Sequence, residues 1–469
     1  MPLRSFWKVL IVGACILLGL RASPGTARAE DARPNVVVIL TDDMSRWDLA
    51  HMPNVQQLLQ AQGVTYPDYV TPNPLCAPSR AALLTGLASP HSNVWANNGI
   101  HGGYTAFTPF LDDDLPVWLH QAGYETSIDG KFENGFVSTD PVPAGWDDSH
   151  ILLLADTKSG DGESSKDGYF NYATMDDGAV DQHKAAEADY STTVLGGDAV
   201  SFIQQADPDR PVFVYFTPHA PHLPVTPAPQ YVHAAACKRL KSPRTPDYYQ
   251  IGSDAPSWEQ LLAPPMPGHE DGLMVKRCET LLSVDDEVGA IVQTLRDTGR
   301  LADTLIVFTS DNGYSLGQHD WEGKLTPYPE SDTLPLVVRW DARPFLAAGS
   351  SSSQLVETMD LPVAIADAAG AATPASDGED FLFGPPRTSA PIEHALQKEK
   401  VVPDYCGIIE DGMRYALYQD GSQDLYDLTA DPYELDNLAN SEPYTAAQLR
   451  TDALTACTPR PPGWPRRLG

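Results

Sequence analysis

The sequence predicts an α/β protein with a doubly wound, mostly parallel sheet and a small C-terminal α+β subdomain. Three observations support this fold class. Short apolar runs alternate along the chain with segments of helical periodicity, an order typical of strand–helix–strand units. Polar clusters follow several of these runs directly, at the strand ends where α/β folds bind ligands. A length of 469 residues, with 42% hydrophobic and 20% charged residues, indicates a globular chain with a large core.

The first strand is predicted over residues 34–40, a continuous β-branched run that indicates burial on both faces of a sheet. It ends at Asp42 and Asp43. Four later strands are predicted over residues 124–128, 212–216, 304–308 and 335–338. The polar residues after the first three of these are Lys131, His219 with His222, and Asp311 with Asn312.

Helices are predicted between these strands over residues 115–122, 194–205 and 281–295. Two further segments interrupt the alternation: residues 140–189 are acidic and rich in glycine, and residues 238–270 are rich in proline. Both are interpreted as insertions that lie over the candidate ligand site at the strand ends. They either shape a substrate pocket or form solvated loops, and the sequence leaves both interpretations open.

The C-terminal part begins after a predicted helix over residues 361–369. Residues 370–391 are rich in Ala, Gly, Pro and Ser and are interpreted as a linker. Strands at 414–418 and 424–427 are predicted to form a hairpin with a two-residue turn at Asp420-Gly421, followed by a helix over 446–456. We therefore expect a catalytic domain over residues 30–370, and a linker with a small subdomain over 371–469.

Residues 1–29 have the pattern of a cleaved secretory signal peptide. Arg4 and Lys8 precede an apolar run over residues 9–20, and a small-residue cleavage site follows at residues 27–29. The run is short for a bilayer span, although an uncleaved anchor is an alternative. We expect a mature protein that is secreted or periplasmic, with no membrane span.

The charge balance narrows the classes of partner. The formal net charge is −32, and removal of the signal segment, which carries four cationic side chains and no carboxylate, makes the chain more acidic. Such acidity opposes binding to nucleic acid, to anionic membranes and to the middle of a long polyanion. An anionic substrate would need a small, locally positive pocket.

Six cysteines divide into three groups. Cys15 lies in the signal segment and Cys76 in a motif of its own, which leaves four in an exported chain. An even remainder predicts two disulfides, most simply Cys237–Cys278 and Cys406–Cys457 among three possible pairings. No cysteine spacing matches a zinc site.

Cys76 is predicted to begin a helix. Pro78 suits the first turn and Gly86 the C-terminal cap. The N–H groups of a helix start favour an anion, and Arg80, one turn further on, would add a full charge. The stretch can therefore hold an oxyanion beside a reactive side chain, although a free buried cysteine beside a helix cap is the simpler alternative.

Asp42, Asp43, Asp311 and Asn312 offer only oxygen, at comparable strand ends. This set favours a hard cation, Ca²⁺ or Mg²⁺, although each pair taken alone could cap a helix. Arg80, Lys131, His222 and Lys324 could supply positive charge to a transferring group and a proton to a leaving alcohol. The residues alone do not choose between His219 and His222, and His319 is interpreted as structural or as a substrate contact.

The chain resembles the formylglycine-dependent sulfatases. The resemblance rests on Cys76-x-Pro78-Ser79-Arg80 followed by a small-residue helix, and on motifs in matching order at residues 33–43, 123–131, 220–222, 308–313, 323–324 and 425–438. It implies an alkaline-phosphatase-like core and a bound Ca²⁺, with Mg²⁺ less suitable. It also implies that a formylglycine-generating enzyme converts Cys76 to formylglycine (3-oxoalanine) before or during export.

The resemblance implies roles for the site residues. The hydrated aldehyde of residue 76 attacks sulfur, the alcohol leaves, and the second hydroxyl expels sulfate. Arg80 steadies the hydrate, and His222 or Lys324 protonates the departing oxygen. Lys131, His222 and Lys324 hold the sulfate, while Asp42, Asp43, Asp311 and Asn312, together with residue 76, hold the metal.

One position departs from the common sulfatase pattern. Many sulfatases have histidine two residues after the first lysine, where this chain has Glu133. The arrangement Lys131-Phe132-Glu133-Asn134, like Asn97-Asn98 and residues 280–286, is similar to the glucosamine-6-sulfatase branch. Asn134 is the candidate substitute for that histidine.

The expected substrate is a small or chain-terminal sulfate ester, either a sulfated amino sugar or an aryl sulfate. Two alternatives remain open. The same apparatus could hydrolyse phosphodiesters or phosphonate monoesters, or the chain could be an inactive sulfatase-like binding protein.

Overall fold

A ten-stranded mixed sheet forms the centre of the protein in the computed structural model, which describes residues 33–154, 168–252, 254–262, 266, 268–396 and 401–468. The strand order is β13-β2-β12-β9-β1-β8-β4-β5-β6-β7. The central strands are β1 (Asn35–Thr41), β4 (Glu125–Gly130), β8 (Val212–Thr217) and β9 (Thr304–Ser310). These four pair in parallel, as predicted.

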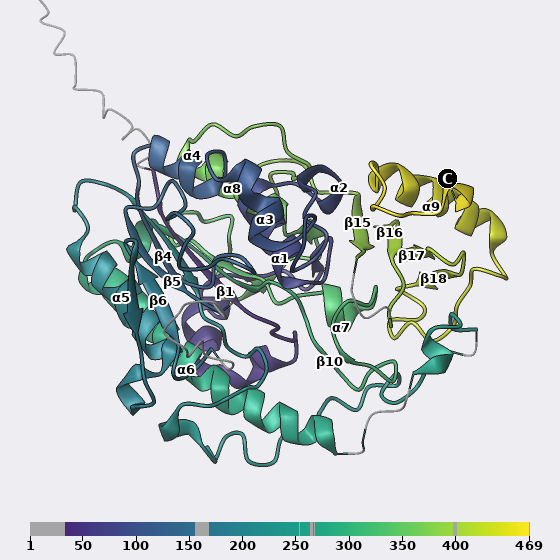
Figure 1. Cartoon of the computed structure of the whole chain (residues 1–469), viewed down its shortest axis with the longest axis horizontal. Coiled ribbons are helices and arrows are strands. Elements are labelled where there is room, and N and C mark those ends of the chain that lie inside the picture. Colours follow the sequence, from purple (N-terminus) through teal and green to yellow (C-terminus); the bar gives the residue numbers. More distant parts are fainter. Residues whose placement is uncertain are drawn as a thin grey trace, which may run out of the picture. The chain divides into compact units, whose positions relative to one another are not determined.

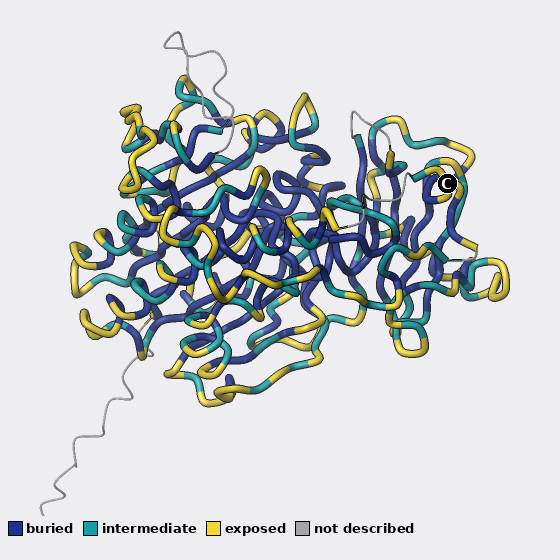
Figure 2. The backbone as a smooth tube through the Cα atoms, turned by 90° about the horizontal axis from the view of Figure 1, so that it is seen from below, coloured by how far each residue is buried: buried dark blue, intermediate teal, exposed yellow. Residues whose placement is uncertain are grey.

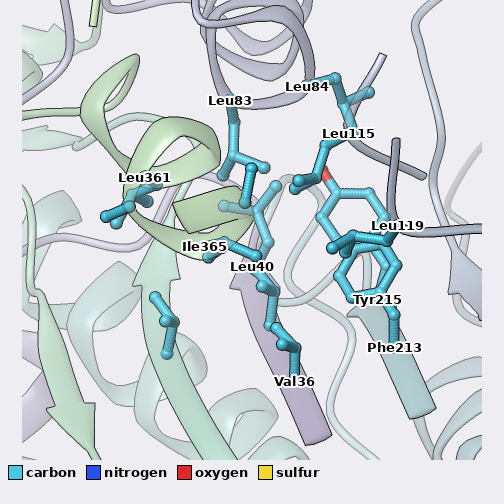
Figure 3. Close-up of a cluster of buried hydrophobic side chains, with 14 of the residues drawn as sticks. Val36, Leu40, Leu83, Leu84, Leu115, Leu119, Phe213, Tyr215, Leu361 and Ile365 are labelled. Carbon is cyan, nitrogen blue, oxygen red and sulfur yellow. The ribbon is translucent and has the colours of Figure 1, made fainter. Parts of the chain in front are cut away.

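Helices cover both faces of this sheet (Figure 1). One face packs against α1 (Cys76–Thr85), α4 (Leu115–Gln121) and α8 (Asp360–Ala369), and the other against α5 (Ser191–Gln205) and α6 (His269–Asp297). Because successive side chains of a strand point to opposite faces, β1 contributes to both cores. Val36, Val38 and Leu40 enter the first core, drawn in Figure 3, and Val37 and Ile39 enter the second. The doubly wound architecture is confirmed.

The buried backbone in Figure 2 is concentrated in the strands and the helix faces that meet them, whereas many of the connecting loops are exposed. The shorter elements complete the fold: β2 (Val64–Thr65), β3 (Tyr69–Val70), β10 (Ser315–Leu316), β11 (Glu322–Gly323), β13 (Ser350–Ser351), β14 (Val356–Glu357), α2 (Ser89–Ser92), α3 (Gly103–Phe107) and α7 (Pro329–Asp332).

The structure corrects the interpretation of residues 140–189 as an insertion alone. Three strands from this segment extend the main sheet: β5 (Asp148–Leu152) in parallel with β4, then β6 (Ala173–Asp176) and β7 (Ala179–Gln182) in antiparallel pairing. These strands are short and polar, and β7 is wholly exposed, so they lack the apolar signal of a buried strand. Part of the segment, residues 155–167, lies outside the described residues.

Two other elements differ from prediction. The last predicted strand of the sheet is β12 (Val337–Arg339), and it pairs antiparallel with β9, which makes the sheet mixed. Helix α6 begins at His269, twelve residues before the predicted start. Its first turns bury Glu270, Arg277 and Glu279, so apolar periodicity does not mark their burial.

A four-stranded antiparallel sheet forms the C-terminal part, in the order β15-β16-β17-β18. The strands are β15 (Ser389–His394), β16 (Tyr405–Glu410), β17 (Met413–Tyr418) and β18 (Gln423–Asp427), and α9 (Pro443–Ala456) packs against their apolar side chains. The predicted hairpin is present, but its loop spans residues 419–422, not two residues, and β15 begins inside the predicted linker.

Two disulfides, Cys237–Cys278 and Cys406–Cys457, confirm the predicted pairing, and Cys76 is the one free cysteine among the described residues. No helix in the described ranges is long and apolar enough to cross a membrane. The predicted signal peptide, including Cys15, lies outside those ranges.

Candidate active site

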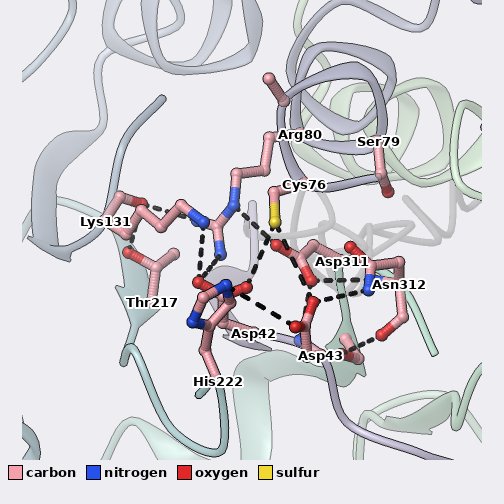
Figure 4. Close-up of polar contacts among 12 residues, drawn as sticks. Asp42, Asp43, Cys76, Ser79, Arg80, Lys131, Thr217, His222, Asp311 and Asn312 are labelled. Carbon is pink, nitrogen blue, oxygen red and sulfur yellow. Dashed lines mark hydrogen bonds and ion pairs between the residues drawn. The ribbon is translucent and has the colours of Figure 1, made fainter. Parts of the chain in front are cut away.

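The parallel register of β1 and β9 brings two acidic turns together. Thr41 pairs with Ser310, so the residues after each strand are neighbours. The Asp43 amide donates to Asp311 Oδ1 at 3.1 Å, and Asn312 Nδ2 donates to Asp43 Oδ1 at 2.7 Å. All of these side chains are buried. The predicted convergence of Asp42, Asp43, Asp311 and Asn312 is thus observed (Figure 4).

Cys76 faces this acidic group from the start of α1. The helix begins at Cys76 and ends at a left-handed Gly86, as the sequence predicts. The Sγ atom lies 3.5 Å from Asp42 Oδ1 and 4.0 Å from Asp43 Oδ1, and the residue is fully buried. Burial and the Asp42 carboxylate raise the pKa of the Cys76 thiol to about 12, against the opposing charges of the neighbouring lysines. The thiol is therefore protonated near neutral pH and is a weak nucleophile.

Arg80 lies one helical turn after Cys76 and reaches across the strand ends. Its Nε donates to Asp311 Oδ2 at 2.9 Å and its Nη1 to the Lys131 carbonyl at 2.7 Å. The third nitrogen, Nη2, lies 3.8 Å from Asp42 Oδ2 and is buried without a hydrogen-bond acceptor among the described residues. Arg80 thus keeps one N–H group available for an additional acceptor.

Two lysines approach Cys76 from different elements. Lys131, after β4, places Nζ 2.7 Å from Asp42 Oδ2, and Lys324, after β11, places Nζ 2.9 Å from Cys76 Sγ and in contact with Asp43 Oδ1. Burial opposes their charged forms, but the carboxylates prevail and raise both lysine pKa values. Both lysines are therefore cationic.

The pKa values of the neighbouring carboxyl groups shift in the opposite direction. Burial alone would raise the pKa of Asp42, but Lys131, His222, His219 and Arg80 hold that pKa well below its usual value. The pKa of Asp43 is also lowered, because Lys324 and His222 outweigh burial. These two carboxyl groups are ionised at neutral pH.

Two histidines follow β8, and both contact the acidic pair. His219 Nδ1 lies 3.3 Å from Asp42 Oδ2, and His222 Nε2 lies 3.7 Å from Asp43 Oδ2. Burial lowers the pKa of His219 to about 4, so its ring is neutral. The His222 side chain is 31% exposed, and its Nδ1 lies 2.7 Å from the Leu223 carbonyl. The sequence did not choose between these two histidines. Exposure distinguishes them, because a substrate can reach His222 whereas His219 is buried.

The acidic group has the donor chemistry of a hard-cation site. Asp42, Asp43 and Asp311 present carboxylate oxygens, and the Asn312 amide can present its oxygen after rotation about its terminal torsion. One ligand atom from each of Asp42, Asp43, Cys76 and His222 lies within 4.8 Å of the others. Asp42, Asp43, Asp311 and Asn312 therefore have the oxygen donors that Ca²⁺ or Mg²⁺ requires, but the group of close ligand atoms includes Cys76 and His222 and not Asp311.

Glu133 and Asn134 lie directly beyond Lys131. Glu133 is 4% exposed and neither carboxyl oxygen has a hydrogen-bond partner among the described residues. Burial raises its pKa well above the usual range, although Arg80 and Lys131 oppose this. The Asn134 carbonyl accepts from the Tyr104 amide at 2.7 Å, and its side-chain oxygen is also buried and unpaired within the described ranges.

His319 belongs to a different group of buried side chains, with Asp247 and Glu330. Its ring stacks on Tyr328 at a centroid distance of 3.8 Å. A cavity of about 530 Å³ does adjoin the Cys76 region, since Leu75 and Lys324 line it together with Asn97, Asn98, Leu325 and Leu396. Asn97 Oδ1 also accepts from the Ala77 amide at 3.0 Å. The sequence identified Asn97 and Asn98 only through their similarity to the glucosamine-6-sulfatase branch.

Solved structures share this architecture. A protein in complex with its substrate D-glucosamine-2-N,6-O-disulfate aligns with a TM-score of 0.74 at 22% identity, covering 91% of this chain and 97% of that one. The phosphonate monoester hydrolase of Agrobacterium radiobacter aligns with a TM-score of 0.68 at 20% identity, covering 90% and 95%. These alignments define the fold as the alkaline-phosphatase-like α/β class, which confirms the predicted fold.

The sulfatase family model matches residues 34–371, and the chain belongs to the sulfatase family. N-acetylglucosamine-6-sulfatase from Homo sapiens is 32% identical over 380 residues, which cover 77% of this chain and 64% of the relative. The extracellular sulfatase SULF-1 homologue from Drosophila melanogaster is 30% identical over 374 residues, covering 77% of this chain. The match spans only 32% of that second relative.

Proposed function

We propose that this chain hydrolyses organic sulfate esters at the site around residue 76. The observation that carries the proposal is the convergence of Arg80, Lys131 and Lys324 on Cys76, in a chain of net charge −32. Each of these cations contacts a carboxylate, Asp311, Asp42 or Asp43, so the pocket becomes locally positive, as an anionic ester requires, once a divalent cation offsets those carboxylates. Membership of the sulfatase family supports a sulfate ester as the anion.

Residue 76 acts as formylglycine in this proposal. The protonated, buried thiol is a poor nucleophile, whereas a hydrated aldehyde at the same position would supply a hydroxyl for attack on sulfur. A formylglycine-generating enzyme is the corresponding partner, acting before or during export. Residues 1–29 are then removed as a signal peptide, and the mature protein is secreted or periplasmic.

Asp42, Asp43, Asp311 and Asn312 hold a divalent cation, and the oxygen-only set favours Ca²⁺ or Mg²⁺ over zinc. Of these two ions, the resemblance to the sulfatases favours Ca²⁺. Residue 76 lies close enough to these carboxylates to join the set. When bound, the cation would offset the negative charge of the sulfate oxygens and lower the pKa of a hydroxyl at residue 76.

The other side chains of the site bind the sulfate group and transfer a proton. Lys131 and Lys324 bind sulfate oxygens, and Arg80, fixed by Asp311 and the Lys131 carbonyl, directs its free Nη2 toward the reacting group. His222 donates a proton to the leaving alcohol from Nε2, since its Nδ1 faces the Leu223 carbonyl. Lys324 is the alternative donor, and Asn134 takes the role of the histidine that Glu133 replaces.

The substrate class is a small or chain-terminal sulfated amino sugar. The human relative bears the name N-acetylglucosamine-6-sulfatase, and the cavity of about 530 Å³ beside Lys324 has the size of a small-ligand pocket. Among the described residues, no carboxylate lines that cavity, whereas the chain as a whole is strongly acidic. In this proposal residues 30–370 form the catalytic domain, and residues 371–469 form the linker and supporting subdomain.

The fold shared with a phosphonate monoester hydrolase supports a second candidate activity on phosphorus esters. Paired 4-nitrophenyl sulfate and 4-nitrophenyl phenylphosphonate assays distinguish the two. The expected result is a higher kcat/KM for the sulfate, and a clear preference for the phosphonate would overturn the proposal. Mass spectrometry of the peptide that contains residue 76 accompanies the assay, because an unconverted thiol would identify an inactive sample.

A further inference from the structure

A second cluster of buried polar side chains lies in segments near Lys324. Asp247 belongs to the 238–270 segment, His319 lies between β10 and β11, and Glu330 lies in α7. Their exposed fractions are 1%, 2% and 3%. One potential ligand atom from each lies within 4.8 Å of the other two. Residues far apart in sequence therefore meet at one enclosed point.

The hydrogen bonding of this cluster is incomplete. Within the described residues, neither ring nitrogen of His319 has a hydrogen-bond partner, and the same holds for Asp247 Oδ1 and Glu330 Oε2. The His319 Nε2–Asp247 Oδ2 distance of 3.6 Å is too long for a hydrogen bond. Arg46 engages only the other Glu330 oxygen, Oε1, at 3.0 Å. Buried polar atoms without partners are costly, so four such atoms in one cluster point to a ligand between them.

The spacing suits a metal ion better than a direct ion pair. In tetrahedral zinc sites, metal–ligand bonds of about 2.1 Å place neighbouring ligand atoms about 3.4 Å apart. The 3.6 Å separation of His319 Nε2 and Asp247 Oδ2 is close to this value. The ring stacks on Tyr328 with an interplanar angle of 4°, which fixes its orientation.

We propose that Asp247, His319 and Glu330 bind a divalent transition-metal ion, best fitted by Zn²⁺, at a structural site separate from the oxygen-only site at Asp42 and Asp43. One imidazole and two carboxylates form a mixed nitrogen and oxygen set, which zinc accepts and which Ca²⁺ does not prefer. Two carboxylates also supply the negative charge that a buried dication requires.

The ion would join the 238–270 segment to the loop that carries Lys324. Backbone hydrogen bonds already connect them, from the His319 amide to the Asp247 carbonyl at 3.0 Å and from the Tyr249 amide to the Gly317 carbonyl at 2.8 Å. Lys324 directly follows β11 and reaches Cys76 Sγ. A bound ion would therefore stabilise the segment that positions this lysine, without contacting the reacting atoms.

Zinc binding to the purified chain tests the proposal. The Cys76→Ala variant serves as the parent, because it removes the thiol that could capture zinc near Asp43, and Ca²⁺ in excess occupies the oxygen-only site. After dialysis against buffered Zn²⁺, elemental analysis should find one zinc per chain, and zinc should raise the Tm. His319→Gln and Glu330→Gln, each in this parent, should weaken zinc binding at least tenfold.

His394→Gln is the matched control. His394 is also fully buried, and neither of its ring nitrogens has a hydrogen-bond partner among the described residues, but it belongs to neither group of potential metal ligands found there. It should leave the zinc content unchanged. Absence of zinc from the parent, or equal zinc content in the parent and a folded His319→Gln variant, would overturn the proposal.

If the substituted chains fail to fold, Co²⁺ in the parent provides the second measurement. Tetrahedral or five-coordinate Co²⁺ gives visible d–d absorption, and a coordinated imidazole gives paramagnetically shifted ring-proton signals. Both are expected at one equivalent, and their absence would overturn the proposal. Neither measurement depends on sulfatase activity, so failure of the proposed function would not affect this result.

Discussion

Two groups of buried carboxylates in this protein have opposite surroundings. Around Cys76, Asp42 and Asp43 contact Lys131 and Lys324, and their pKa values are lowered. Near the C-terminal sheet, burial raises the pKa of Asp424 to about 7, and that of Glu259 is raised well above its usual range.

The second group contacts hydroxyls instead of cations. Tyr418 and Tyr426 donate to Asp424 at 2.5 and 3.3 Å, and Tyr328 donates to Glu259. Burial alone therefore does not make a functional carboxylate. Paired cations keep the first group ionised and able to bind a metal, whereas burial among tyrosines favours the protonated forms of Asp424 and Glu259.

The largest expected effect is loss of activity on substituting residue 76. Cys76→Ala should reduce kcat/KM for an aryl sulfate by about 10⁴-fold or more, because it removes the nucleophile. Steady-state assays on equal amounts of folded protein measure this. Thr85→Ala, at the other end of α1, should retain activity; equal losses in both variants would indicate damage to the helix instead of the chemistry.

Removal of either lysine should have the next largest effect. Lys131→Ala and Lys324→Ala should each lower kcat/KM by about 10²- to 10³-fold, as expected when a charge that stabilises the transition state is lost. Lys184, an exposed lysine, provides the control through Lys184→Ala. A change of less than threefold at both buried lysines would contradict their role in binding sulfate.

His222→Gln should separate proton donation from binding. A sugar sulfate, whose alcohol leaves poorly without a proton, should lose about 10²-fold in kcat, and 4-nitrophenyl sulfate, whose phenol leaves more readily, should lose less. The ratio of the two losses is the measurement. Equal losses for both substrates would argue against His222 as the proton donor.

The smallest expected effect concerns Asp424, which contacts Tyr418 and Tyr426. It appears in the free energy of unfolding, not in activity. The folded pKa of Asp424 is raised to about 7, so the folded state holds its proton more tightly than the unfolded chain. This stabilisation is complete below about pH 4 and is lost as pH rises to about 7, by up to about 1.4 kcal/mol per pH unit.

Asp424→Asn keeps the shape of the side chain and cannot ionise, so its free energy of unfolding should vary less between pH 4.5 and 7.5. Urea unfolding at several pH values provides the measurement, with Asp452→Asn on the exposed face of α9 as the control. The same pH dependence in the Asp424→Asn variant and in the unsubstituted protein would show that Asp424 is already ionised when buried.

Much of the central sheet was predictable, because strands buried on both faces leave a strong apolar signal. The runs at β1, β8 and β9 are of this kind, and their polar ends identified the acidic group and the two histidines His219 and His222. Strands β5 to β7 were not predicted, since β5 and β6 are short and polar and β7 is exposed, so none of them has a continuous apolar run. The start of α6 was missed because it buries charged side chains such as Arg277, which pairs with Asp48.

The site residues could be predicted only where they directly follow strands that pair in parallel. Asp42 and Asp311 could be brought together from parallel pairing alone. The contacts of His319 with Asp247 and Tyr328 depend on how irregular loops fold over one another, and no periodicity records this. His219 and His222 likewise differ in exposure. The sequence does not reveal this difference, because both histidines lie in the same loop.

The complete burial of Cys76 sets an order of events during biosynthesis. Every residue of α1 is buried against the sheet and its neighbouring helices, so a modifying enzyme cannot reach the thiol once the chain has folded. Under the proposed function, conversion of this cysteine would therefore have to compete in time with folding. A chain that folded before it was modified would keep its native stability and both disulfides but would lack the proposed activity.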